Sequence, residues 1–173
     1  FNSFSNADQF SVFCDSMFRM IKEMEIENLI IDMRINGGGD SNIGYELFQY
    51  ISPVPFQQFD KTICKYSNLQ KRLALESFGA DYSSQPNGTY ELVVDSLTPL
   101  RPNPLRFRGN AYLLISHTTF SSAGSYSWAF KKFNMGTIVG EESGGMSVCF
   151  GDIVIYKLPN SGISSTISFA RMY

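Results

Sequence analysis

Residues 111–124 read Ala-Tyr-Leu-Leu-Ile-Ser-His-Thr-Thr-Phe-Ser-Ser-Ala-Gly. The apolar run at 111–115 predicts a strand, and the aromatic and small residues that continue to 130 predict a helix. Ser121 lies on the turn between them, where an α/β enzyme can expose a nucleophile beside helix N–H groups that hold an oxyanion. A structural interpretation stays open, because serine routinely caps the N-terminus of a helix.

A second strand, loop and helix come earlier in the chain. The apolar run at 28–33 predicts a strand buried on both faces, and 36–39, Asn-Gly-Gly-Gly, predicts a loop. Asp40 or Ser41 then caps a helix that Pro53 ends. The loop matches neither a phosphate loop nor a dinucleotide loop. Two interpretations remain: an oxyanion hole made of backbone N–H groups, or a tight turn with no chemistry.

The remaining sequence predicts further helices and strands. Helical spacing of Phe and Met indicates a core-facing helix over about 6–25. The other expected elements are a strand at 56–66, a helix at 68–78, a short strand at 90–95, a proline-containing linker, a strand at 137–139 and a hairpin of 153–158 with 163–169. We therefore expect one α/β domain over 1–173, with strands packed by helices, a variable insert at about 54–108 and a C-terminal β-hairpin.

Composition excludes several classes of protein. A hydrophobic fraction of 43% and a charged fraction of 17% are typical of a soluble globular domain. With a net charge of -2 and no basic stripe, nucleic acid is not an expected partner. The three cysteines match no metal motif and indicate no disulfide framework. Because the chain opens on Phe1 and stops within an apparent strand at 164–170, we expect both ends to be cuts in a longer protein.

The order and spacing of three motifs are more specific than any one of them. They are Asp-x-Arg-x-Asn-Gly-Gly-Gly from Asp32, the Ser121 turn, and Gly-Thr-Ile-Val-Gly-Glu-Glu-Ser-Gly-Gly at 136–145. Together they resemble the C-terminal processing (tail-specific) serine peptidase family, over about 28–52 and 109–170 but not over the insert between. Gly-Asp-Ile and Leu-Pro-Asn-Ser-Gly near the C-terminus resemble members from Bacteroidetes-type bacteria. The resemblance implies a crotonase-like or ClpP-like core, a polypeptide substrate, no cofactor, no metal, and export to the periplasm, cell envelope or extracellular space.

The resemblance also implies roles for residues of the first two motifs. Ser121 matches the nucleophile of the family. Gly38 or Gly39 would donate one backbone N–H to the oxyanion, and Ser122, the residue after the nucleophile, would donate the other.

Three further residues are implied to be structural, and the general base is expected to lie elsewhere. Asp32 and Arg34 would form a charged pair that holds the glycine loop, and Glu141 would support its own turn. Members with a Ser–Lys dyad carry lysine where this chain has Met146, which cannot accept a proton. The resemblance is therefore to the tricorn-core-like branch, whose catalytic histidine lies in an upstream segment. The only histidine here, His117, is interpreted as a surface residue.

These observations predict a serine-type peptidase whose base comes from outside residues 1–173, so that this fragment alone is inactive. Two other classes stay open. One is a catalytically inactive member of the same fold that binds peptides or apolar ligands. The other is an acyl-thioester enzyme of crotonase type, which also uses a backbone oxyanion hole but does not require a serine nucleophile.

Overall fold

The computed structural model describes residues 1–93, 96–146 and 148–173. They form two compact units, one of residues 1–58 and 96–146 and the other of 59–93 and 148–173. Each unit has its own cluster of buried apolar side chains. The sequence indicated one core with an insert at about 54–108. In the structure, most of that insert shares the second cluster with the C-terminal strands.

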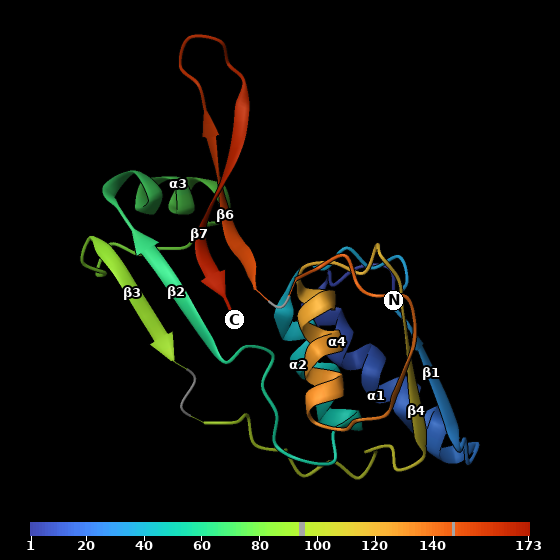
Figure 1. Ribbon diagram of the computed structural model, residues 1–173. Coiled ribbons are helices and arrows are strands. Elements are labelled where there is room, and N and C mark those ends of the chain that lie inside the picture. The colour runs from blue at the N-terminus through green and yellow to red at the C-terminus, as the bar shows by residue number, and fades with distance from the viewer. Residues whose placement is uncertain (94–95, 147) are drawn as a thin grey trace. The chain divides into compact units, whose positions relative to one another are not determined.

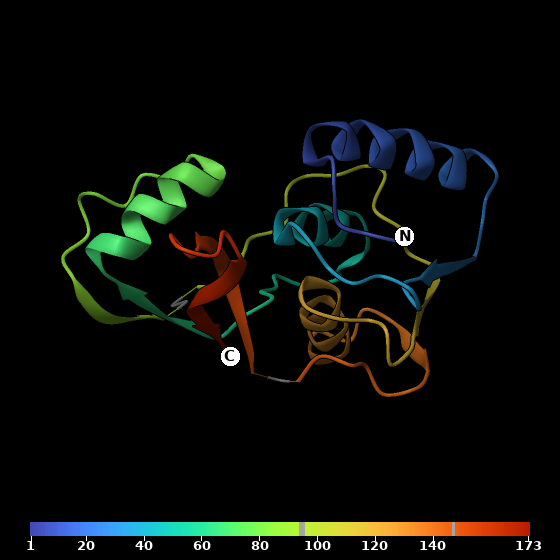
Figure 2. The same ribbon diagram turned by 90° about the horizontal axis from the view of Figure 1, so that it is seen from above.

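The first unit contains a parallel sheet with the strand order β1-β4-β5. Its strands are β1 (Asn28–Asp32), β4 (Asn110–Ile115) and β5 (Thr137–Gly140). Its helices are α1 (Ala7–Glu23), α2 (Ser41–Ile51) and α4 (Ser122–Lys132). α2 and α4 lie on one face of the sheet, and α1 packs against α2 (Figure 1 and Figure 2). The two strand-loop-helix segments expected from sequence are therefore present.

β1 differs from the expectation of a strand buried on both faces. Ile31 faces the helices and is 2% exposed, whereas its neighbour Ile30 is 64% exposed. The reason is that alternate residues of a strand point to opposite faces, and the helices cover only one face of this sheet.

Aromatic stacking fixes the helices against one another. Phe48 of α2 stacks on Tyr126 of α4 with ring centroids 4.2 Å apart, and Phe18 of α1 stacks on Tyr50 of α2 at 4.7 Å. Because β1 and β4 are parallel neighbours, the loops that follow them lie at the same edge of the sheet. The glycine loop and the Ser121 turn are therefore brought together.

The second unit is an antiparallel sheet with the strand order β3-β2-β7-β6. Its elements are β2 (Lys61–Tyr66), α3 (Asn68–Phe78), β3 (Gly88–Val93), β6 (Cys149–Lys157) and β7 (Ser164–Met172). The predicted α3 and C-terminal hairpin are confirmed. β2 begins later than expected, since Phe56 forms a bridge with Thr98 of the first unit instead. None of the described helices has the length and apolar character needed to cross a membrane.

Candidate active site

Ser121 adopts an unusual backbone conformation at the start of α4. Its φ is 53° and its ψ is −128°. A positive φ is rare for a residue that has a Cβ, and such conformations cost about 1–3 kcal/mol unless the surroundings hold them. Ser121 occupies the N-cap position, but its side chain makes no capping hydrogen bond. The capping interpretation is therefore wrong for Ser121. A strained strand-to-helix turn is instead how hydrolases expose a nucleophilic serine.

Thr119 ties this turn to the end of β1. The Thr119 side chain is fully buried, and its Oγ1 donates to the backbone carbonyl of Met33 at 2.8 Å. The same Oγ1 accepts from the backbone N–H of Ser116 at 3.0 Å. Sequence reasoning missed this residue, although a threonine in a turn of small hydroxyl residues is a recognised signal for such a bond.

Gly38 lies directly against Ser121. Its φ is 98°, and a Cβ added to Gly38 would lie 2.7 Å from the Cβ of Ser121 and 2.8 Å from the backbone nitrogen of Ser122. Only glycine fits there, for both its backbone conformation and its close approach. The glycine loop therefore contacts the turn that carries the candidate nucleophile.

The side chain of Ser122 joins the glycine loop to α4. Ser122 Oγ donates to the carbonyl of Gly39 at 2.6 Å and accepts from Ser41 Oγ at 3.2 Å. Among the described residues, the backbone N–H groups of Gly39 and Ser122 have no acceptor. The N–H of Gly38, in contrast, donates to Asn36 Oδ1 at 2.8 Å. Two of the three predicted oxyanion donors are therefore unoccupied.

The third sequence motif also reaches this turn. The N–H of Gly144 donates to the carbonyl of Thr119 at 3.1 Å. A Cβ on Gly145 would lie 3.6 Å from the backbone nitrogen of Ser121. Met146, which follows, is 82% exposed. The three motifs that lie apart in the sequence thus meet around Ser121.

His117 and Glu141 form a pair at the surface. His117 Nδ1 lies 3.0 Å from Glu141 Oε2, and both side chains are exposed. The hydrogen bond from His117 lowers the pKa of the Glu141 carboxyl. The structure thus places His117 on the surface, as expected, and gives Glu141 a partner that the sequence did not indicate.

Asp32 and Arg34 form the expected ion pair. The Arg34 guanidinium donates to the two carboxylate oxygens of Asp32 at 3.0 and 2.8 Å. This hydrogen bonding lowers the pKa of Asp32 to about 2. Within the described ranges, neither side chain bonds to the glycine loop. The carbonyl of Arg34 instead accepts from the hydroxyl groups of Ser116 and Thr118, which precede the Ser121 turn.

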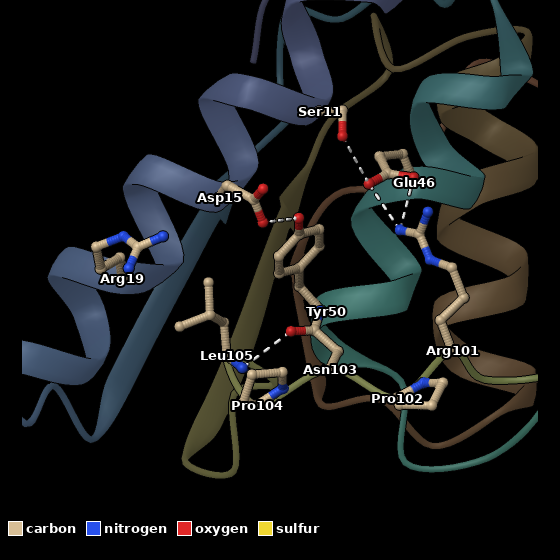
Figure 3. A pocket seen from close by; sticks show the side chains of 10 residues that line it. All are labelled: Ser11, Asp15, Arg19, Glu46, Tyr50, Arg101, Pro102, Asn103, Pro104 and Leu105. Atoms are coloured by element: carbon tan, nitrogen blue, oxygen red, sulfur yellow. Dashed lines mark hydrogen bonds and ion pairs between the residues drawn. The ribbon is translucent and has the colours of Figure 1, made fainter.

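A pocket of about 420 Å³ in the first unit does not include Ser121 (Figure 3). It lies between α1, α2 and residues 101–105, and its charged groups are largely satisfied by one another. Tyr50 donates to Asp15 at 2.5 Å, and Arg101 donates to both carboxylate oxygens of Glu46 at 2.7 and 2.8 Å. These contacts hold α1 to α2, and α2 to residues 101–105.

No metal-binding cluster of three or more His, Cys, Asp or Glu side chains occurs in the part of the chain that the structure describes.

Several solved structures are similar to this chain. The photosystem II D1 C-terminal processing protease is 17% identical, with a TM-score of 0.57 over 98% of this chain and 35% of that chain. Mature CPAF complexed with lactacystin is 16% identical, with a TM-score of 0.66 over 96% of this chain and 39% of that chain. A putative peptidase from Parabacteroides merdae ATCC 43184 is 22% identical, with a TM-score of 0.58 over 99% of this chain and 46% of that chain. At these identities the similarity shows the fold, and this chain spans less than half of each.

The predicted mixed α/β fold is therefore confirmed. The sequence model of peptidase family S41 matches residues 1–170. This match includes the segment between 52 and 109, which we had expected to lie outside the resemblance, so that boundary was wrong. The chain belongs to peptidase family S41.

Proposed function

We propose that the protein to which these residues belong is a serine-type peptidase with Ser121 as its nucleophile. The observation that carries the proposal is the conformation of Ser121, which has a positive φ, no capping bond and the glycine loop packed against it. A hydroxyl group held in this way beside unoccupied N–H donors matches what acyl transfer requires.

The reaction follows from these groups. Ser121 Oγ attacks the carbonyl carbon of the scissile peptide bond and gives its proton to a general base. The carbonyl oxygen becomes an oxyanion and accepts hydrogen bonds from the N–H groups of Gly39 and Ser122. Collapse of the tetrahedral intermediate expels the amine, which takes the proton from the base, and water then hydrolyses the acyl-enzyme. Gly39 is preferred to Gly38 because the N–H of Gly38 already donates to Asn36.

The general base is proposed to be a histidine from a segment of the longer protein outside residues 1–173. Met146 has no group that accepts a proton, and no hydrogen bond joins the exposed His117 to Ser121 among the described residues. The fragment alone is then expected to be inactive or nearly so. By the same family resemblance, we propose that the longer protein is exported to the periplasm, cell envelope or extracellular space, which cell fractionation tests.

Hydrolysis of an unfolded polypeptide tests the proposal. The longer protein is expected to cleave it, its Ser121→Ala variant to lose the activity, and residues 1–173 to show none. Peptide binding without cleavage by the folded longer protein would favour the inactive binding member of the fold. Efficient cleavage by residues 1–173 that disappears in Ser121→Ala would overturn the external base and point to His117. Acyl-CoA binding would revive the thioester alternative.

A further inference from the structure

We infer that Asn36 is a positioning residue of the oxyanion hole, acting through the glycine loop. This inference rests on the proposed function of Ser121. Asn36 lies between β1 and the three glycines, and its side chain is fully buried. Sequence reasoning treated it only as part of the loop.

Asn36 makes hydrogen bonds to both the glycine loop and the Ser121 turn. Its side-chain Oδ1 accepts the N–H of Gly38 at 2.8 Å, and its backbone carbonyl accepts the N–H of Phe120 at 3.0 Å. Gly38 belongs to the loop, and Phe120 directly precedes Ser121. A single residue therefore sets the spacing between the glycine loop and the nucleophile turn.

The bond to Gly38 also determines which N–H groups remain available. Three consecutive glycines have wide conformational freedom, so the loop alone does not hold one orientation. Asparagine commonly bonds the backbone two residues further on, and this bond turns the N–H of Gly38 toward Asn36. The N–H of Gly39 is left without an acceptor among the described residues. The side chain thus selects Gly39 as the donor.

The useful part of Asn36 is its acceptor oxygen. Its Nδ2 is buried and has no hydrogen-bond partner among the described residues. A buried amide nitrogen without a partner is unfavourable, so the nitrogen does not explain why asparagine suits this position. A serine at position 36 could also accept from the N–H two residues on, although more weakly. Serine is therefore expected to replace asparagine in part, and alanine is not.

Kinetics of the longer protein test this role. Asn36→Ala is expected to lower kcat by about 10²–10³-fold, the effect of losing one oxyanion donor, while KM changes by less than about threefold. Asn36→Ser should recover about tenfold or more of the lost rate. Asn103→Ala is the matched control, because Asn103 Oδ1 accepts from the N–H of Leu105 at 2.9 Å in the same kind of turn, away from Ser121. The control should keep the wild-type kcat.

A measurement on the wild-type protein does not depend on whether a variant folds. Before reaction, the Gly38 amide should be protected from hydrogen exchange and the Gly39 and Ser122 amides should exchange readily. After a fluorophosphonate reacts at Ser121, the Gly39 and Ser122 amides should become protected from exchange, and the Gly38 amide should stay protected as before. A Gly38 amide that exchanges as readily as that of Gly39 before reaction would overturn the inference, as would a folded Asn36→Ala variant that reacts at the wild-type rate. If the wild-type protein itself does not react, the proposed function fails instead.

Discussion

α2 and α4 both follow a strand of the same parallel sheet, yet they begin in opposite ways. α2 begins after Asp40, which has an ordinary extended conformation and accepts the N–H of Asn42 at 2.9 Å. α4 begins after Ser121, which has a positive φ and makes no capping bond. Both residue types are good N-caps. Only one of them is used as a cap.

The difference shows where the fold gives up stability. A capping bond contributes about 1 kcal/mol, and a non-glycine residue at positive φ costs about 1–3 kcal/mol. At Ser121 the neighbours maintain this conformation, with Gly38 packed against its Cβ and Thr119 anchored to Met33. Strain that is held in place by surrounding contacts is commonly found at functional sites.

The largest effect is expected from Ser121 itself. Ser121→Ala should lower peptidase activity of the longer protein by about 10⁴-fold or more. Ser121→Gly should also be inactive, but it should raise the free energy of unfolding by about 1 kcal/mol, because glycine adopts the positive φ without strain. Denaturant unfolding measures this gain. A loss of stability in Ser121→Gly would mean that Ser121 is an ordinary cap after all.

Two glycines of the loop test how closely the loop packs against the Ser121 turn. Gly38→Ala should destabilise the protein by about 3 kcal/mol or more, because the new Cβ would meet the Ser121 Cβ and backbone atoms at 2.7–2.8 Å. Gly37→Ala should change stability by less than about 1 kcal/mol, since nothing lies within 4 Å of a Cβ there. Thermal unfolding of the two variants compares them. Equal effects would show that the loop does not pack on the nucleophile turn.

A smaller effect is expected at the conventional cap. Asp40→Ala should lower the free energy of unfolding by about 1 kcal/mol through loss of the bond to Asn42. Asp40→Asn keeps an acceptor oxygen and should cost less. If Asp40→Ala were neutral, the contrast between the starts of α2 and α4 would not be one of capping.

The smallest effect concerns the exposed pair of Asp32 and Arg34. Since the folded-state pKa of Asp32 is lowered from 3.8 to about 2, the pair stabilises the fold above about pH 4 and loses this contribution as the pH falls toward 2. The thermal midpoint of wild type should therefore exceed that of Arg34→Gln slightly at pH 5, and the two should converge near pH 2. A difference that grows on acidification would contradict this assignment.

Local patterns in the sequence predicted much of the fold. α3 has the predicted bounds, Asn68–Phe78, and the strand-loop-helix segments around Gly38 and Ser121 are present. The exposure of Ile30 could not be predicted, because it depends on which face of the sheet distant helices cover. Similarly, the two separate cores depend on contacts between segments that are far apart in the chain.

For the site, residue types were predictable but their bonding was not. The three motifs indicated Ser121, Ser122 and either Gly38 or Gly39, and the structure brings these residues together. The positive φ of Ser121 is imposed by packing from other segments, so no local pattern signals it. Asn36 did carry a signal, since asparagine before glycine favours a side-chain bond to the backbone two residues on.

Mapping a fluorophosphonate adduct on the longer protein tests whether Ser121 is the nucleophile. One adduct is expected, on Ser121, and it should be absent from the Ser121→Ala variant. This expectation would be contradicted by a folded protein that does not react, or by an adduct on Ser122 or another serine while Ser121 stays unmodified.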